Sequence, residues 1–138
     1  MKKSTSQLVM YCLLLLAAVS ISASCNKNKD KMIPPELHFK TDAGYTYADC
    51  TLTTNDTITV GVNAAKTEGK DLLTRFVVAQ SLDGASSTTW YQESFNNDTY
   101  TKDLTIITRN VAGTEKYTFT IINRDGLVTS LNLMLTVN

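Results

Sequence analysis

Residues 113–126 read GTEKYTFTIINRDG, a glycine-bounded stretch in which apolar side chains occupy every second position from Tyr117 to Ile121. Threonines fill the positions between them. Alternation with a period of two is typical of a β-strand with one buried face, and β-branched threonines suit its solvent-facing side. The closing pair Asp125-Gly126 is typical of a hairpin turn, because glycine accepts the positive φ that such turns require. The stretch therefore predicts one strand of an antiparallel sheet and the turn that follows it.

The same alternation recurs before and after this stretch. We predict seven strands in all, and from Glu36 onward the spacing of apolar residues indicates no long helix. The other six strands are predicted at residues 37–39, 58–62, 73–80, 88–95, 104–106 and 131–137. A second hairpin turn is predicted at Asp83-Gly84, and longer loops at 96–98 and 110–113. Seven short strands separated by turns predict two packed sheets.

Residues 113–126 also resemble the penultimate strand of immunoglobulin-like domains, including the PKD and fibronectin-III types. In those domains a glycine precedes a tyrosine, the tyrosine precedes an alternating run, and a turn with glycine leads into the last strand. The resemblance implies an immunoglobulin-like β-sandwich. It also implies that Tyr117 forms a tyrosine corner, with its hydroxyl bonded to nearby backbone, and that Phe119 takes the place of the second antibody cysteine.

The N-terminal segment has the features of a signal peptide. Lys2 and Lys3 precede an uncharged run over residues 8–19. A membrane-spanning helix needs roughly 20 apolar residues, so this run is too short to span and is typical of a signal-peptide core. Small residues then lead to Cys25, after which the chain becomes polar.

The sequence SASC at residues 22–25 resembles the lipobox of bacterial lipoproteins, with Ser22 where Leu, Val or Ile is usual. This looser form is similar to that of Bacteroidota lipoproteins. The resemblance implies that Cys25 is lipidated and that the chain is held at the outer membrane, on the cell-surface or periplasmic face. The predicted parts are a signal peptide (1–24), a polar tether (25–35) and the immunoglobulin-like domain (36–138). The alternative is an ordinary signal peptide cut after Ala23 or Ser24, which would leave Cys25 a free thiol.

Charge and cysteine content exclude several classes of function. The 13 basic and 13 acidic side chains give a formal net charge of zero. We expect no nucleic-acid partner, because non-specific nucleic-acid binding depends on neutralising phosphates. Membrane contact is expected through the lipid on Cys25. Since Cys12 would leave with the signal peptide, Cys50 would have no disulfide partner, and we expect it to be a small buried hydrophobe rather than a reactive thiol.

Groups with catalytic or metal-binding potential are sparse. His38, the only histidine, alternates with Leu37 and Phe39 and is expected to face outward. No spacing pairs it with a nucleophile, so we predict no catalytic residues and no enzyme. Several Asp and Asn residues lie in or near predicted loops, at Asp83, Asn96, Asn97, Asp98, Asp103 and Asp125. They match no calcium-loop pattern and are explained by turn formation, so we expect no metal and no cofactor.

Aromatic residues are the candidate ligand contacts. Trp90 and Tyr91 are neighbours on one predicted strand, so we expect them to face opposite sides, without a preference for which ring is exposed. Tyr100 follows the polar loop at 96–98. Exposed aromatic rings stack on sugars and anchor interfaces, so Tyr91 and Tyr100 are the predicted contacts. Core packing of Trp90 and an ordinary surface role for the tyrosines remain the simpler explanation.

These features together predict a non-enzymatic binding or interaction domain on a lipid anchor, with a protein or glycan partner. The alternative is an accessory glycan-binding lipoprotein of a polysaccharide-uptake system. That alternative is implied by the resemblance to Bacteroidota lipoproteins and not by any sequence motif.

Overall fold

The computed structural model describes residues 32–138, so the predicted signal peptide, Cys25 and most of the tether lie outside the described residues. This part of the chain forms eight β-strands. They are β1 (Glu36–Phe39), β2 (Cys50–Leu52), β3 (Thr57–Ala65), β4 (Leu73–Leu82), β5 (Thr88–Asn97), β6 (Thr99–Ile107), β7 (Gly113–Asn123) and β8 (Val128–Val137). Within residues 32–138, no helix is long and apolar enough to cross a membrane.

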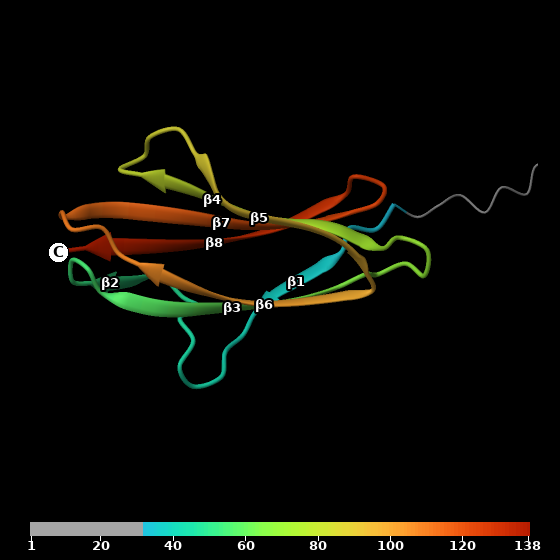
Figure 1. The fold of residues 1–138 in the computed structure, drawn as a ribbon, viewed down its shortest axis with the longest axis horizontal. Coiled ribbons are helices and arrows are strands. Elements are labelled where there is room, and N and C mark those ends of the chain that lie inside the picture. The colour runs from blue at the N-terminus through green and yellow to red at the C-terminus, as the bar shows by residue number, and fades with distance from the viewer. Residues whose placement is uncertain (1–31) are drawn as a thin grey trace, which may run out of the picture. The chain divides into compact units, whose positions relative to one another are not determined.

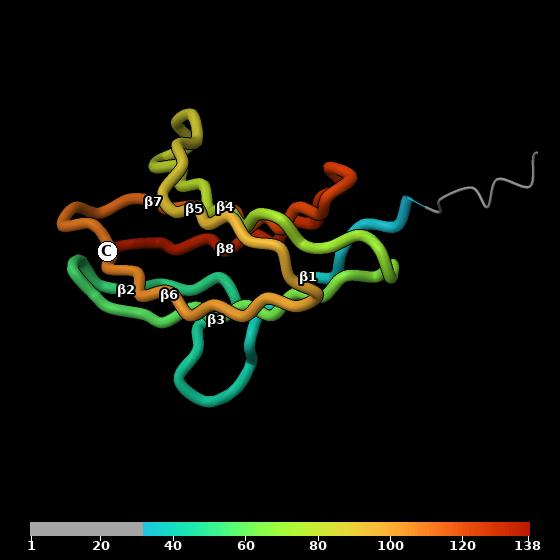
Figure 2. Tube along the Cα trace, turned by 45° about the vertical axis from the view of Figure 1, so that its right-hand side comes forward, coloured from blue at the N-terminus to red at the C-terminus, as the bar shows by residue number. Residues whose placement is uncertain are grey.

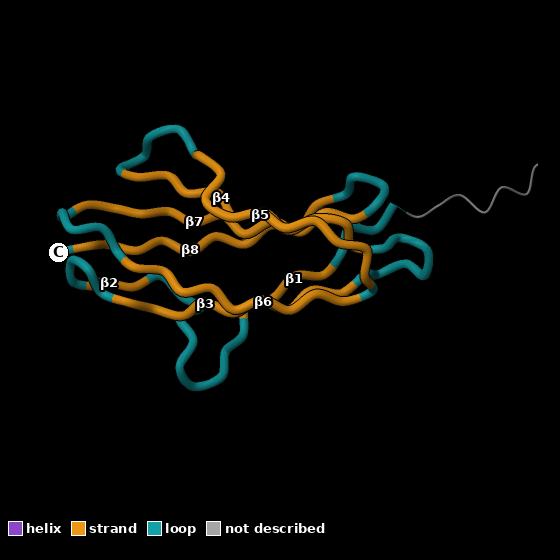
Figure 3. Tube along the Cα trace, in the orientation of Figure 1, coloured by secondary structure: helices purple, strands orange, loops and turns teal. Residues whose placement is uncertain are grey.

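The strands form two sheets packed face to face (Figures 1 and 3). The three-stranded sheet has the order β1-β3-β6, and the five-stranded sheet has the order β2-β8-β7-β4-β5. β2 runs parallel to β8, and the other pairings are antiparallel. This arrangement confirms the predicted all-β, immunoglobulin-like sandwich.

β2 is not among the seven strands that the sequence predicts. The chain pairs with β3 as far as Lys40, whose N–H donates to the carbonyl of Gly61 at 2.8 Å. It then leaves the sheet in the projecting loop seen in Figure 2, returns at Thr46 to donate to Thr59 at 2.8 Å, and crosses to β8 as residues 50–52. A strand of three residues is too short to show alternation, so its sequence does not reveal it.

The core lies between the two sheets and consists of the alternating apolar residues that the sequence predicts. Phe119 is fully buried, and its ring meets that of Phe39 edge-on with centroids 5.3 Å apart. Tyr117 and Ile121, two residues before and after Phe119, are buried as well. Other buried apolar residues from the two sheets are Leu37, Ile58, Val60, Val62, Ala64, Leu73, Phe76, Val78, Tyr100, Leu104, Ile106, Leu133, Leu135 and Val137.

The hydroxyl of Tyr117 does not form the predicted bond to backbone. It donates to Oε2 of Glu115 at 2.7 Å and accepts from Nε2 of Gln80 at 2.8 Å. Glu115 is itself buried, and its other oxygen accepts the backbone N–H of Arg109 at 2.7 Å. Burial, and then the bond to Glu115, raises the pKa of Tyr117. A buried carboxylate without hydrogen-bond donors destabilises the fold. The Tyr117 hydroxyl therefore donates to Glu115 instead of to the backbone, and no tyrosine corner forms.

The predicted hairpin turns are confirmed, and one predicted loop is wrong. The Asp-Gly pairs at 83–84 and 125–126 join β4 to β5 and β7 to β8, with positive φ at both glycines and at Asp83. Residues 96–97 continue β5 instead of forming a loop, so Asp98 alone links β5 to β6. Since these strands belong to different sheets, the chain changes sheets at this residue, and both run along one side of the sandwich (Figures 1 and 2).

Arg109 ties the β6–β7 loop to the β4–β5 turn. Its guanidinium donates two hydrogen bonds of 2.6 Å to Asp83 and one of 2.9 Å to the carbonyl of Ala112. Asp83 also accepts the N–H of Thr114 at 2.8 Å. The guanidinium lies against Gly113, whose φ is +148°, and a Cβ at this position would overlap it. This close approach explains why a glycine opens the strand.

Candidate functional site

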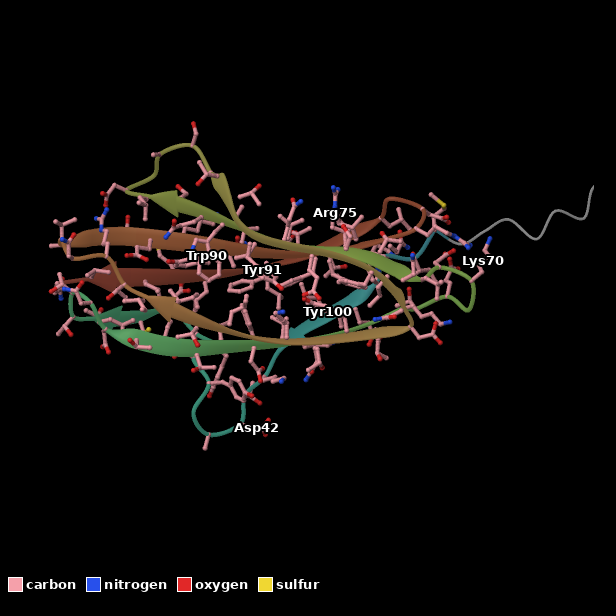
Figure 4. All side chains as sticks on the ribbon, viewed as in Figure 1. Asp42, Lys70, Arg75, Trp90, Tyr91 and Tyr100 are labelled. Atoms are coloured by element: carbon pink, nitrogen blue, oxygen red, sulfur yellow. The ribbon has the colours of Figure 1, made fainter. Side chains whose placement is uncertain are left out.

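The two predicted ligand contacts, Tyr91 and Tyr100, meet at one carboxylate. Tyr91 lies opposite Val78 of β4, and Tyr100 lies opposite Ala64 of β3. Directly paired residues place their side chains on the same face of a sheet. Val78 and Ala64 are buried, so both tyrosines point between the sheets, as Figure 4 shows. Both hydroxyls donate to Oε2 of Glu93, at 2.6 Å from Tyr91 and 2.9 Å from Tyr100.

Glu93 is the centre of this site. It lies opposite the buried Phe76 and therefore also points inward. Lys102 donates from Nζ to the same oxygen at 3.1 Å, and its Nζ lies 4.9 Å from the ring centroid of Tyr91. The side chains of Glu93 and Lys102 are 41% and 32% exposed. We call Tyr91, Glu93, Tyr100 and Lys102 the β5–β6 cluster; it spans the gap between the sheets and reaches solvent.

Hydrogen bonding holds the β5–β6 cluster in one charge state. The bonds from Tyr91, Lys102 and Tyr100 lower the pKa of Glu93 to about 2. The hydroxyl of Tyr91 and the bond to Glu93 raise the pKa of Lys102, while burial and then Glu93 raise the pKa of Tyr100. The cluster therefore presents a carboxylate, an ammonium group and two neutral tyrosine hydroxyls bonded to one another.

Tyr100 is more buried than the sequence indicates. The pattern predicts a position beside a loop, but Tyr100 is the second residue of β6 and is 8% exposed. Its ring stacks on that of Phe95, with centroids 4.3 Å apart and planes at 5°, and lies 5.1 Å from the ring of Phe76. Tyr100 therefore supports the site through its hydroxyl, and the accessible part of the site comes from its neighbours.

The prediction that Trp90 and Tyr91 face opposite sides is wrong because β5 contains a bulge. Val78 pairs with Tyr91, and the next residue of β4 pairs with Thr89, so Trp90 is the extra residue. A bulge sets two residues against one and interrupts the alternation. The ring of Trp90 accordingly meets the buried ring of Tyr117 edge-on at 5.6 Å, while Trp90 remains 38% exposed. Both neighbours thus contact the core, and Trp90 is the more exposed ring.

His38 and Cys50 are not brought together. His38 is exposed on β1 opposite Asn63, which confirms the predicted outward orientation. Cys50 begins β2 in the other sheet, where it packs against the core but is only partly buried. Burial, followed by the nearby carboxylates of Asp49 and Asp56, raises the pKa of the Cys50 thiol. A raised pKa keeps the thiol protonated, which agrees with a small hydrophobe and not with a nucleophile.

Three of the four aspartates that the sequence places in or near loops pair with a lysine or an arginine. Asp98 pairs with Lys66 and Asp103 pairs with Lys40, each at 2.6 Å, in the same way that Asp83 pairs with Arg109. Asp103 itself lies within β6 rather than in a loop. Across the described range 32–138, no group of three or more His, Cys, Asp or Glu side chains could hold a metal ion.

Glu93 and Lys102 were not singled out by the sequence. A signal for their orientation was nevertheless present, because each lies two residues after a predicted contact: Glu93 after Tyr91, and Lys102 after Tyr100. Alternation puts such residues on one face of a strand. Whether this face of β5 meets this face of β6 depends on which sheet each strand joins. The sequence of a single strand does not contain this information.

The fold and site define an immunoglobulin-like β-sandwich domain with an aromatic and charged cluster on one side. No protein-family model matches the sequence, and no curated protein matches it. The chain is similar to the crystal structure of the CARDB domain of the PF1109 protein from Pyrococcus furiosus, in complex with di-metal ions. The identity is 17%, 79% of this chain and 97% of that chain are covered, and the TM-score is 0.41. A solution NMR structure of that CARDB domain matches with 16% identity, 75% and 96% coverage and a TM-score of 0.42. At this level of similarity, neither structure bears on a ligand or an activity.

Proposed function

We propose that this protein is an outer-membrane lipoprotein, anchored through acyl chains on Cys25, whose β-sandwich is a non-enzymatic interaction domain. The observation that carries the proposed interaction is the placement of Trp90: a bulge in an edge strand holds its ring 38% exposed next to Tyr91. Bulges re-aim side chains at functional sites, and exposed Trp and Tyr are common binding anchors. The fixed charge states of Glu93 and Lys102 support binding over catalysis.

The proposed contact surface is the β5–β6 side of the sandwich. Trp90 and Tyr91 supply ring surface, while Glu93 and Lys102 supply a carboxylate and an ammonium group that reach solvent. Tyr100 contributes its hydroxyl, which holds Glu93 in place. A surface site is expected rather than a deep pocket, because sheets about 10 Å apart are filled by their own side chains.

An accessory glycan-binding role is the second candidate. It is favoured by polar groups on the same face of β5 as the Trp90 ring: Thr88 is exposed and lies opposite Gln80, whose Nε2 donates to the hydroxyl of Tyr117, and the side chain of Glu93 reaches solvent. A hydroxyl and a carboxylate match the hydroxyls of a sugar, whose apolar ring face would stack on the indole. A protein partner would instead be expected to need additional apolar surface around the tryptophan.

The anchor is tested by Cys25→Ser in cells that express the full chain. We expect the wild type to partition into detergent and the mature variant to remain in the aqueous phase. Mapping of the N-terminus separates a soluble mature chain from one that keeps its signal peptide. A mature variant that still partitions into detergent would show that lipid on Cys25 is not the anchor.

The ligand site is tested with soluble residues 32–138, on a glycan array and by pull-down from intact cells. Trp90 is the only tryptophan, so its fluorescence reports directly on the proposed surface. We expect Trp90→Ala and Glu93→Gln to abolish capture while circular dichroism stays unchanged. Tyr47→Ala is the matched control, because it removes a 48% exposed ring from the segment between β1 and β2. Undiminished capture by a folded Trp90→Ala, Glu93→Gln double variant would place the site elsewhere, most simply on the loops around Asp83.

A further inference from the structure

Within residues 32–138, β5 and β6 each form one edge of a sheet, so each has a row of backbone groups that no strand of this range pairs with. They contain ten and nine residues, against four in β1 and three in β2 at the other edges. Both run along the same side of the sandwich (Figures 1 and 2). Long free edges are templates on which another chain can add a strand.

The composition of β5 favours such pairing. Its sequence, TTWYQESFNN, is rich in threonine and aromatic residues and contains neither lysine nor proline. These are the residue types that fit a pleated surface, and lysine and proline are the usual means of blunting an exposed edge. The strand most available for pairing with β5 is therefore the β5 of a second copy of the domain.

Two opposite charges lie at the middle of these edges and point inward. Glu93 is opposite the buried Phe76, and Lys102 is opposite the buried Val62. Their charged groups meet at 3.1 Å across the gap between the sheets and remain partly exposed, at 41% and 32%. Inward-pointing charges and bulges both protect sheet edges in natural proteins, and β5 carries one of each, with the bulge at Trp90.

We infer that Glu93 and Lys102 disfavour the pairing of β5 or β6 with a strand from a second copy of this domain. A strand added to β5 or β6 would cover these charged groups and remove their remaining water. The cost of that desolvation opposes association, because a surface ion pair gains little in return. The inference goes beyond the proposed function, since it holds whatever ligand binds and whether or not one does.

The test is the double variant Glu93→Gln, Lys102→Met in residues 32–138. The amide oxygen of the substituted side chain at position 93 can still accept the bonds from Tyr91 and Tyr100, while both charges are lost. We expect a dissociation constant for self-association at least tenfold lower than that of the wild type, measured by light scattering after size exclusion. Hydrogen exchange should show new protection of backbone amides in β5 or β6 in the associated form.

The control variant is Lys40→Met, Asp103→Asn, which removes an equivalent ion pair from the outward face of β6. It should remain monomeric. A folded Glu93→Gln, Lys102→Met variant that is as monomeric as the wild type, with unprotected edge amides, overturns the inference. If that variant does not fold, the double variant Glu93→Gln, Lys102→Thr replaces it. This variant removes the same two charges but places at position 102 a residue typical of strands. Its self-association and the protection of its edge amides then decide whether the inference holds.

Discussion

Lys102 and Asp103 are neighbours in β6, yet their side chains point to opposite faces of the strand and form two different ion pairs. Lys102 points between the sheets and binds Glu93 of β5 at 3.1 Å. Asp103 points outward and binds Lys40 of the segment after β1 at 2.6 Å. One edge strand is thereby connected to the opposite sheet on one face and to a projecting loop on the other. In both ion pairs the lysine also lies over a tyrosine ring.

Replacement of Tyr117 by phenylalanine should destabilise the domain by about 1.5–3 kcal/mol, because the buried Glu115 carboxylate loses a donor. Chemical denaturation measures this change. Tyr45→Phe is the control: its hydroxyl also donates to a carboxylate, that of Asp103 at 3.0 Å, but at an exposed position. Its effect should stay within about 0.5 kcal/mol. Equal losses for the two variants would contradict the buried network.

Phe119→Ala should reduce the free energy of unfolding by about 3–5 kcal/mol, as large-to-small substitutions in a core do. Phe119 is fully buried and contacts Phe39 of the opposite sheet. Thr118→Ala is a suitable comparison, because its side chain lies on the outer face and bonds Asn132 at 2.8 Å. A neutral Phe119→Ala would mean that the register of β7 is shifted by one residue.

Gly113→Ala should destabilise the domain by about 2 kcal/mol or more, since the new methyl group would displace the Arg109 guanidinium from Asp83 and strain a φ of +148°. Gly69→Ala is the matched control, because a Cβ there meets nothing within 4 Å. Thermal melts of both variants measure the difference. Similar melting temperatures for the two would show that the loop relaxes without cost.

Stability should fall as the pH drops from about 4.5 towards 2. In the folded protein the pKa of Asp83 is lowered from 3.8 to about 2, and that of Glu93 from 4.5 to about 2. The unfolded chain therefore takes up protons first, so the stabilisation by these carboxylates is complete above their unfolded pKa values and is lost below them. Denaturant midpoints at pH 6 and pH 2.5 should differ by less in Glu93→Gln than in the wild type. Equal midpoints for the wild type at both pH values would contradict the lowered pKa values.

Residues 32–138 should fold without metal and without a disulfide. The two sheets enclose a continuous core, and Cys50 is the one cysteine in this range. EDTA and reductant should each leave the thermal melt unchanged, within the error of the measurement. A large loss of stability in EDTA would reveal a bound cation that contributes to folding.

Much of the fold was predictable because a strand's burial pattern is local. Alternation at 117–121 and 131–137 correctly identified which side chains are buried, since successive residues of a strand point to opposite faces. The Asp-Gly pairs marked two real turns for an equally local reason, the freedom of glycine at positive φ. Length and composition did not reveal β2, whose three residues form a strand only because β8 is there to pair with them.

The candidate site depended on contacts between residues far apart or out of register. The exposed ring of Trp90 meets the buried ring of Tyr117 because β4 and β5 pair with a bulge, and a bulge is a property of two strands together. Tyr100 is buried because β6 joins the sheet opposite β5, which brings its hydroxyl to Glu93. Periodicity in one strand encodes which side chains share a face. Which faces then meet is set by the packing of both sheets, whose energy belongs to pairs of segments and not to either segment alone.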